Sequence, residues 1–247
     1  SACLVGSEMC IRDRYKGKGG HPLLISETCF SHILRHDGSN GLRGALSSIG
    51  DSMIEIELPD PGLVMDADTP KEYECMRKYA ERLEIPSVEV CDEIQKWFGM
   101  QAQTKKHCTK VAEIAREFTV VLVRAGQLLN LDLIEAGALL HDIAKGHENH
   151  AAKGGEWLEQ LGYSAVSRIV AAHTDLPEDA IEALDERAIV YLADKLVKED
   201  KRITLEEKFS AKLEKFKENE EVTASVLRRM AAAKYILERI YEIAKSA

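Results

Sequence analysis

A histidine and an aspartate stand side by side directly after an apolar run, at His141 and Asp142. The preceding run, Ala136–Leu140, has the composition of a buried helix, and desolvated polar side chains are costly unless they bind something. Neighbouring helix positions point about 100° apart, so a single helix cannot close a metal shell around this pair. Other helices must supply further ligands. The candidates are His107, in the first turn of a predicted helix, and Asp194, which follows another apolar stretch.

Imidazole nitrogens and carboxylate oxygens together suit a divalent transition metal such as iron, manganese, zinc or nickel, with water in the open positions. Five of the eight histidines lie between positions 107 and 173, which concentrates this chemistry in one part of the chain. The sequence therefore predicts a metal site that several helices build together.

Three short segments, in this order, resemble the HD superfamily of metal-dependent phosphohydrolases, whose pattern is a histidine, an adjacent His-Asp pair and a distant aspartate. The segments are Lys106–Ala112, Leu139–Lys145 and Leu192–Asp194, and the resemblance covers residues 104–200. Members of the HDIG type carry glycine after the isoleucine, where this chain has Ala144. The resemblance implies that one metal ion is held by His107, His141, Asp142 and Asp194.

Two further histidines resemble the second-metal ligands of some members of that superfamily. His150 is followed by Gly154, as in those members, and His173 follows an apolar stretch. The resemblance implies that both residues hold a second ion, with Asp142 as the bridge. Two ions a few ångströms apart clamp a phosphate and activate water near neutral pH. Lys145 is expected to neutralise charge on the phosphoryl group, so Asp142 and Lys145 are the expected catalytic residues.

Other polar residues of this region have simpler interpretations. His147 and Lys195 are interpreted as solvated residues at helix ends, outside the ligand set. Asp175 is interpreted as a helix cap or a loop carboxylate. A lone histidine at position 173 would be a satisfied core residue, and only the neighbouring motifs make it a candidate ligand.

From Ser87 onward, nearly every segment has helical periodicity. Predicted helices span 104–129, 132–145, 150–162, 165–173, 186–199, 204–218 and 222–244. The sequence therefore predicts a mainly α protein in which residues 104–247 form an all-helical HD domain with C-terminal helices. Residues 84–103 are expected to be a linker.

The first third is punctuated by Gly and Pro and predicts a small α/β region. Expected strands are 21–25, 53–58 and 63–65, and expected helices are 26–34, 42–49 and 70–83, the last capped by Thr69. Three segments resemble the C-terminal half of MobA-like nucleotidyltransferases of the molybdenum-cofactor cytidylyltransferase type, which are Rossmann-like. They are Gly20–Ile25, Gly41–Arg43 and Asp66–Tyr73.

Residues 15–83 are therefore expected to be a partial nucleotidyltransferase remnant. Neither the Gly-rich nucleotide loop nor the central metal-binding Asp motif of those enzymes is found, because Lys16–Gly20 comes too late and lacks the Arg-Met ending. We therefore expect no independent transferase activity from this part. Asp66 and Asp68 are interpreted either as residual metal or substrate contacts or as capping carboxylates of a strand-to-helix turn.

The first fourteen residues have neither periodicity nor turn signals. Residues 8–13 back-translate to GAG-ATG-TGT-ATA-AGA-GAC, which resembles the end of a common transposase-based sequencing adapter read in frame. Residues 1–14 are therefore interpreted as a sequencing artefact and excluded from fold prediction. The alternative is a genuine disordered N-terminus.

The composition is that of an ordinary globular protein, with 247 residues and a net charge of −9. No apolar stretch approaches the ~20 residues that a membrane helix needs, and the acidic balance argues against generic nucleic-acid binding. The six cysteines form no C-x-x-C pair and are interpreted as reduced thiols of a cytoplasmic protein. Oligomeric state is left open.

The expected function is that of a metal-dependent phosphohydrolase or phosphodiesterase. It would hydrolyse a nucleotide or another small phosphate ester through metal-activated water, using one or two divalent ions. One alternative is a fragment of a bifunctional molybdenum-cofactor nucleotidyltransferase, in which the HD part is auxiliary or regulatory. A second is a non-catalytic module that a metal stabilises.

Overall fold

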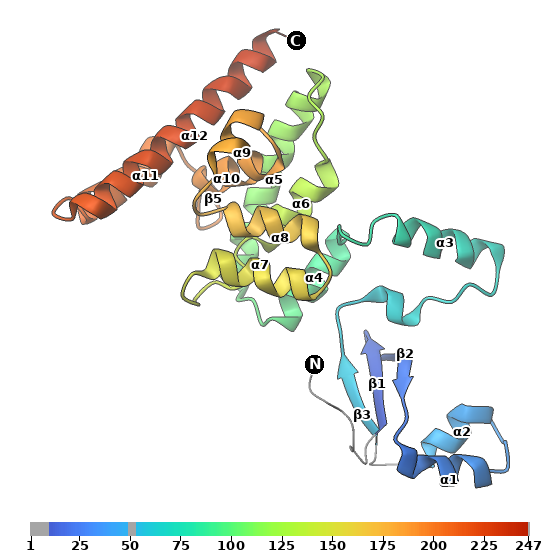
Figure 1. The fold of residues 1–247 in the computed structure, drawn as a ribbon. Coiled ribbons are helices and arrows are strands. Elements are labelled where there is room, and N and C mark those ends of the chain that lie inside the picture. Colours follow the sequence, from blue (N-terminus) through green and yellow to red (C-terminus); the bar gives the residue numbers. More distant parts are fainter. Residues whose placement is uncertain (1–9, 49–52, 247) are drawn as a thin grey trace. The chain divides into compact units, whose positions relative to one another are not determined.

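The computed structural model describes residues 10–48 and 53–246. The chain divides into two compact units, Ser1–Glu81 and Arg82–Ala247. It is mainly helical, with a small sheet near the N-terminus, as the sequence predicts (Figure 1). In the described part of the chain, no helix is long and apolar enough to cross a membrane.

The first unit is built on a three-stranded sheet of order β2-β1-β3. Strand β1 (Cys10–Tyr15) runs antiparallel to β2 (Lys18–Leu24) and parallel to β3 (Met53–Glu57). Lys16 and Gly17 join the first two strands and both have positive φ, which is the conformation of a tight hairpin turn. Helices α1 (Glu27–Arg35) and α2 (Gly41–Ser47) lie between β2 and β3 in the sequence.

The segment interpreted as a sequencing artefact contributes to the fold of this unit. Residues 10–14 form most of β1, where their backbone pairs with two partner strands, and the artefact interpretation stays a prediction. Residues 1–9 of the same segment lie outside the described residues. The expected strand over 63–65 is wrong, because residues 63 and 64 belong to a 3₁₀ turn over Pro61–Val64, in which the Asp60 side chain accepts the Gly62 N–H.

Helix α3 (Pro70–Ala80) begins as the sequence predicts. The Thr69 hydroxyl accepts the Glu72 N–H at 3.2 Å, and the Glu72 carboxylate accepts the Thr69 N–H at 2.9 Å. This reciprocal pair is a capping box, and Pro70 occupies the first helical position.

The second unit is helical apart from one small antiparallel hairpin, β4 (Val197–Lys198) with β5 (Lys201–Arg202). Its longer helices are α4 (Val88–Trp97), α5 (Ala102–Arg124), α6 (Leu131–Leu140), α7 (His150–Gln160), α8 (Ser164–Ala172), α10 (Glu186–Lys195), α11 (Leu205–Lys215) and α12 (Glu220–Ser246). The short α9 (Glu178–Ala183) and the hairpin were not predicted.

The expected linker at 84–103 instead contains α4, which belongs to the helical unit. Val90, Cys91 and Ile94 of this helix are buried in the core. The Gln95 amide donates to the Leu139 carbonyl at 2.7 Å, which joins α4 to α6. Apolar residues at helical spacing after a Ser N-cap produce this segment, so the linker prediction is wrong.

The expected helix bounds differ from the observed ones where caps decide them. Helix α5 ends at Arg124 rather than near 129, because Gly126 takes a positive φ of 89° and its N–H bonds to the Val123 carbonyl. Helix α6 is capped by Asn130 rather than Asp132, since the Asn130 side chain accepts the Leu133 N–H at 3.1 Å.

Helix α10 lies at the centre of the helical unit, in contact with α5, α6, α8 and α12. Residues 188–193 are all fully buried, so every face of this stretch packs against protein. A helix that is apolar all round requires such surroundings. The polar residues that follow it, Asp194 and Lys195, are thereby fixed at the edge of the core.

At Gly137, α6 approaches α8 closely. A Cβ atom there would lie 2.7 Å from Cγ2 of the buried Ile169. We therefore expect Gly137→Val to lower the free energy of unfolding by about 1–3 kcal/mol through overpacking, as measured by urea denaturation.

The matched test is a double-mutant cycle with Ile169→Ala. That change opens space at the same contact, so the loss in the double variant should be smaller than the sum of the two single losses. Additive losses would contradict a direct contact between Gly137 and Ile169.

Candidate metal centre

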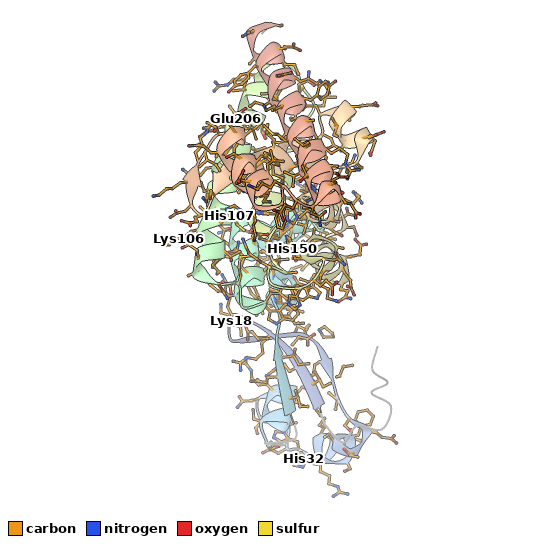
Figure 2. The ribbon with its side chains drawn as sticks, turned by 90° about the vertical axis from the view of Figure 1, so that its left-hand side faces the viewer. Lys18, His32, Lys106, His107, His150 and Glu206 are labelled. Carbon is orange, nitrogen blue, oxygen red and sulfur yellow. The ribbon has the colours of Figure 1, made fainter. Side chains whose placement is uncertain are left out.

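The ends of five helices bring the predicted site residues together. His107 lies in the second turn of α5, His150 is the first residue of α7, and Asp194 lies near the end of α10. His141 and His173 each follow the last residue of a helix, α6 and α8. In Figure 2, His107 and His150 both lie in the middle part of the helical unit. Residues from far apart in the sequence therefore share one site.

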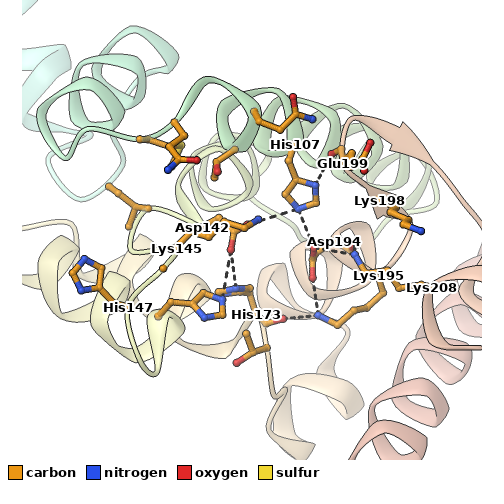
Figure 3. A pocket seen from close by; sticks show the side chains of 18 of the residues that line it. His107, Asp142, Lys145, His147, His173, Asp194, Lys195, Lys198, Glu199 and Lys208 are labelled. Atoms are coloured by element: carbon orange, nitrogen blue, oxygen red, sulfur yellow. Dashed lines mark hydrogen bonds and ion pairs between the residues drawn. The ribbon is translucent and has the colours of Figure 1, made fainter. Parts of the chain in front are cut away.

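Asp142 is the centre of the arrangement (Figure 3). One carboxylate oxygen, Oδ2, lies 3.6 Å from His141 Nε2 and 3.9 Å from His107 Nε2. The other, Oδ1, lies 3.5 Å from His150 Nε2 and 3.7 Å from His173 Nε2. The two oxygens of one carboxylate thus face two different pairs of histidines.

Asp194 supplies the second carboxylate on the His107 side. Its Oδ1 lies 3.1 Å from His107 Nε2 and 3.9 Å from His141 Nε2. Its Oδ2 accepts a hydrogen bond from Lys195 Nζ at 2.8 Å, and Lys208 Nζ lies 3.7 Å from Oδ1. The two lysines balance the charge of this buried carboxylate.

Backbone carbonyls orient three of the histidine rings. Nδ1 donates to the Glu199 carbonyl in His107 (2.8 Å), to the Ala138 carbonyl in His141 (2.8 Å) and to the Val170 carbonyl in His173 (2.6 Å). Because a carbonyl only accepts, Nδ1 of each ring carries a proton, so neutral His141 and His173 turn the Nε2 lone pair toward Asp142, while Nε2 of His107 lies within hydrogen-bond distance of Asp194 Oδ1, at 3.1 Å. This is the outer-shell arrangement typical of metal-binding histidines.

The Nε2 atom of His141 is buried and has no hydrogen-bond partner among the described residues. Such an atom is costly unless a ligand satisfies it. Its lone pair points into a group of carboxylate and imidazole atoms, where a metal ion would satisfy it. The donor set therefore fits a bound cation.

The protonation states also suit metal binding. Burial lowers the pKa of His141, and burial together with the neighbouring His141 lowers the pKa of His173 to about 3. Burial alone would raise the pKa of Asp142, but His141 and the Lys145 ammonium lower it to about 2. Near pH 7 His141 and His173 are consequently neutral and Asp142 is charged, which are the forms that bind metals.

Among the residues that the structure describes, two groups of ligand atoms are compact enough to hold an ion, each with its atoms within 4.8 Å of one another. The first is His107, His141 and Asp142, and the second is Asp142, His150 and His173. Asp142 belongs to both groups, and Asp194 adjoins the first through the distances given above.

The close approach of α7 to α8 positions the second group. At Gly154 a Cβ atom would lie 3.0 Å from Val170 Cγ1, and at Gly155 it would lie 3.2 Å from the Ser167 carbonyl oxygen. These glycines let the two helices pack closely, and the His150 and His173 rings lie 5.1 Å apart. Gly154, the glycine that follows His150 in the sequence motif, thus has a packing role.

The site opens into a cavity of about 860 Å³. All the predicted site residues except His141 line it, including Lys145, whose Nζ donates to Asp142 Oδ2 at 2.6 Å. His147 also lines the cavity and is exposed, with its ring 5.2 Å from the Trp157 ring. It belongs to neither group of ligand atoms.

The interpretation of Lys195 as a solvated residue is wrong. Lys195 is buried, and its ammonium donates to Asp194 Oδ2 and, at 2.9 Å, to the His173 carbonyl. The sequence analysis also missed Lys208, Lys212 and Arg229, which line the same cavity from α11 and α12. The signal available for Lys195 was its position next to a candidate ligand in a buried helix.

Comparison with known proteins agrees with this geometry. Residues 104–199 match the model of the HD domain. An uncharacterized protein of Methanocaldococcus jannaschii is 28% identical over 130 residues, which cover 44% of this chain and 77% of that protein. No solved structure matches.

HD domains bind divalent metals and are typical of metal-dependent hydrolases. The match does not include residues before 104, so the resemblance of residues 20–75 to nucleotidyltransferases stays a prediction. The chain contains an HD domain at residues 104–199.

Proposed function

We propose that this chain is a phosphohydrolase that acts on a nucleotide or another small phosphate ester and uses two divalent metal ions. The observation that carries the proposal is the position of Asp142, whose two oxygens each face a different pair of histidines. The proposed ligands of one ion are His107, His141, Asp142 and Asp194, and those of the other are Asp142, His150 and His173.

A divalent ion at this site would act as a Lewis acid toward a phosphoryl oxygen and would activate a water molecule. The nitrogen and oxygen donors suit iron, manganese, zinc or nickel. Asp142 orients both halves of the site, and Lys145 adds a positive charge at the cavity wall, where its side chain is 53% exposed. The proposed role of Lys145 is to neutralise charge that develops on the phosphoryl group.

The cavity supports a small-molecule substrate. Its volume of about 860 Å³ lies within the range of about 300–1,000 Å³ that is usual for ligand pockets. Apolar side chains of Phe98, Met100 and Trp157 line one part of it, and charged side chains line another part. A nucleotide has this combination of an apolar and an anionic part.

The direct test is phosphate release by the purified chain. With added Mn²⁺ or Fe²⁺ we expect hydrolysis of at least one member of a panel of nucleotides, dinucleotides and sugar phosphates. Removal of metal with a chelator should abolish the release, and addition of Mn²⁺ should restore it.

A matched control is His147→Gln, since His147 lines the cavity without belonging to either group of ligand atoms. This variant should keep the metal requirement and the rate within a factor of about three. Absence of turnover with every metal and substrate would favour the non-catalytic alternative, in which the ions only stabilise the helices.

A further inference from the structure

The cavity is more basic than the chain that contains it. Although the chain carries a net charge of −9, six lysine and arginine residues line the cavity against four aspartate and glutamate residues. The basic ones are Lys145, Lys195, Lys198, Lys208, Lys212 and Arg229, and the acidic ones are Asp142, Asp194, Glu199 and Glu207. A pocket of one sign concentrates ligands of the other sign.

Three of these basic side chains already have partners in the protein. Lys145 binds Asp142, and Lys195 binds Asp194 and the His173 carbonyl. Lys208 donates to the Asp194 carbonyl at 3.0 Å and to the Val197 carbonyl. These three ammonium groups therefore balance the carboxylates of the proposed metal site and bind the backbone carbonyls around it.

Lys212 and Arg229 are different. Lys212 has no ion pair with a carboxylate among the described residues, and Arg229 has one distant contact, with Asp175 Oδ1 at 3.5 Å from its Nε. Asp175 itself is 64% exposed, so water weakens this pair. Figure 3 shows that Lys195, Lys198 and Lys208 lie on the opposite side of the site from His147, whose ring contacts Trp157.

The basic side chains that line the cavity also repel one another. Lys212 is exposed, yet partial desolvation and the positive charges of Lys195 and Arg229 lower its pKa, which the negative charge of Asp194 offsets in part. Glu207, the carboxylate of α11 that lines the cavity, accepts hydrogen bonds from the backbone and side chain of Thr204. An anionic ligand is therefore the natural partner for Lys212 and Arg229.

Both residues lie outside the matched HD domain, on α11 and α12. We propose that Lys212 and Arg229 bind a second phosphate group of the substrate while the first is hydrolysed at the metal centre. The inference rests on the proposed function and narrows it to substrates with at least two phosphates. The Arg229 guanidinium suits bidentate binding of phosphate, and the Lys212 ammonium adds a point charge.

The first test is kinetic, on the full chain with metal. Lys212→Met and Arg229→Gln should each raise the KM of a nucleoside diphosphate by about 10-fold or more, the value of one lost charge-assisted hydrogen bond. The KM of the corresponding monophosphate and both kcat values should change less than about twofold. Equal changes for the two substrates would overturn the inference.

The second test does not depend on turnover. Inorganic pyrophosphate and orthophosphate are titrated into the metal-free full chain by calorimetry. We expect pyrophosphate to bind more tightly than orthophosphate. Each variant should weaken the affinity for pyrophosphate by about 10-fold or more. Unchanged pyrophosphate affinity in the variants, or no binding to the parent chain, would overturn the subsite even if phosphate esters are hydrolysed.

Matched controls lie on the same helices. Arg228→Gln changes the exposed neighbour of Arg229, and Lys215→Met changes a lysine of α11, and neither residue lines the cavity. Both variants should behave as the parent chain in kinetics and calorimetry. If they weaken the affinity for pyrophosphate as much as the test variants do, the loss of any positive charge on these helices has the same effect and the inference fails.

Discussion

Replacing Asp142 with alanine is expected to lower kcat/KM for phosphate release by more than about 1,000-fold. The variant removes the carboxylate that faces all four histidines of the site, so both proposed ions lose a ligand at once. Helix content should change little, because α6 ends at Leu140 and its cap at Asn130 is untouched. The measurements are steady-state kinetics with added Mn²⁺, bound metal by elemental analysis and far-ultraviolet circular dichroism.

The control for this change is Asp132→Ala, the same substitution at the exposed start of α6, the helix that precedes Asp142. Asp132 pairs with Arg82 at 3.1 Å on the surface and does not line the cavity. It should leave turnover and metal content unaltered. Activity retained in Asp142→Ala, with a folded protein, would show that the site assignment is wrong.

Substituting one histidine from each group is expected to separate the two proposed ions. His141→Gln should remove the ion on the Asp194 side, and His173→Gln should remove the one on the His150 side, because each ring contributes its Nε2 to one group only. Bound metal should fall by about one ion per chain in each variant. Turnover should fall by at least about 100-fold in both, since a two-ion clamp needs both members.

Glutamine is chosen because it retains a polar group and much of the volume of the buried ring, which limits the loss of packing. His147→Gln serves as the control and should keep the full metal content. If His173→Gln keeps both its metal content and its rate, the second ion does not exist at this position and a one-ion hydrolase remains.

Three candidate ligands could be predicted from the sequence because polar residues after apolar helical runs are conspicuous, whereas His150 and His173 became candidates only through the resemblance to the HD superfamily. His141, Asp142 and Asp194 each follow a stretch that is buried in the structure. Burial makes such residues costly unless they bind something, so their chemistry is visible without coordinates. The prediction needed no knowledge of how the helices cross.

The parts that failed depend on contacts between distant segments. Helix α4 has apolar residues at helical spacing, yet only its packing against α6 shows that it belongs to the helical unit. Lys195 was predicted to be solvated, because nothing local indicates that α10 lies at the centre of the unit. Lys212 and Arg229 reach the cavity only because α11 and α12 fold back over it.

In the first unit, the sequence predicts correctly a feature that depends on neighbouring residues alone. The Thr69 and Pro70 pair predicts the start of α3, and the structure confirms it with a capping box. The strand over Cys10–Tyr15 was not expected, because residues 1–14 were excluded from fold prediction, and its pairing partners lie at residues 18–24 and 53–57. Strand pairing of this kind is long-range information that a single segment does not carry.

The central claim is that Asp142 lies between two metal ions. The most direct measurement is an anomalous difference map from a crystal grown with Mn²⁺ and recorded at the manganese absorption edge. We expect two peaks, one among His107, His141, Asp142 and Asp194 and the other among Asp142, His150 and His173. A map without a peak beside Asp142, from a crystal in which the protein is folded as described, would contradict the claim.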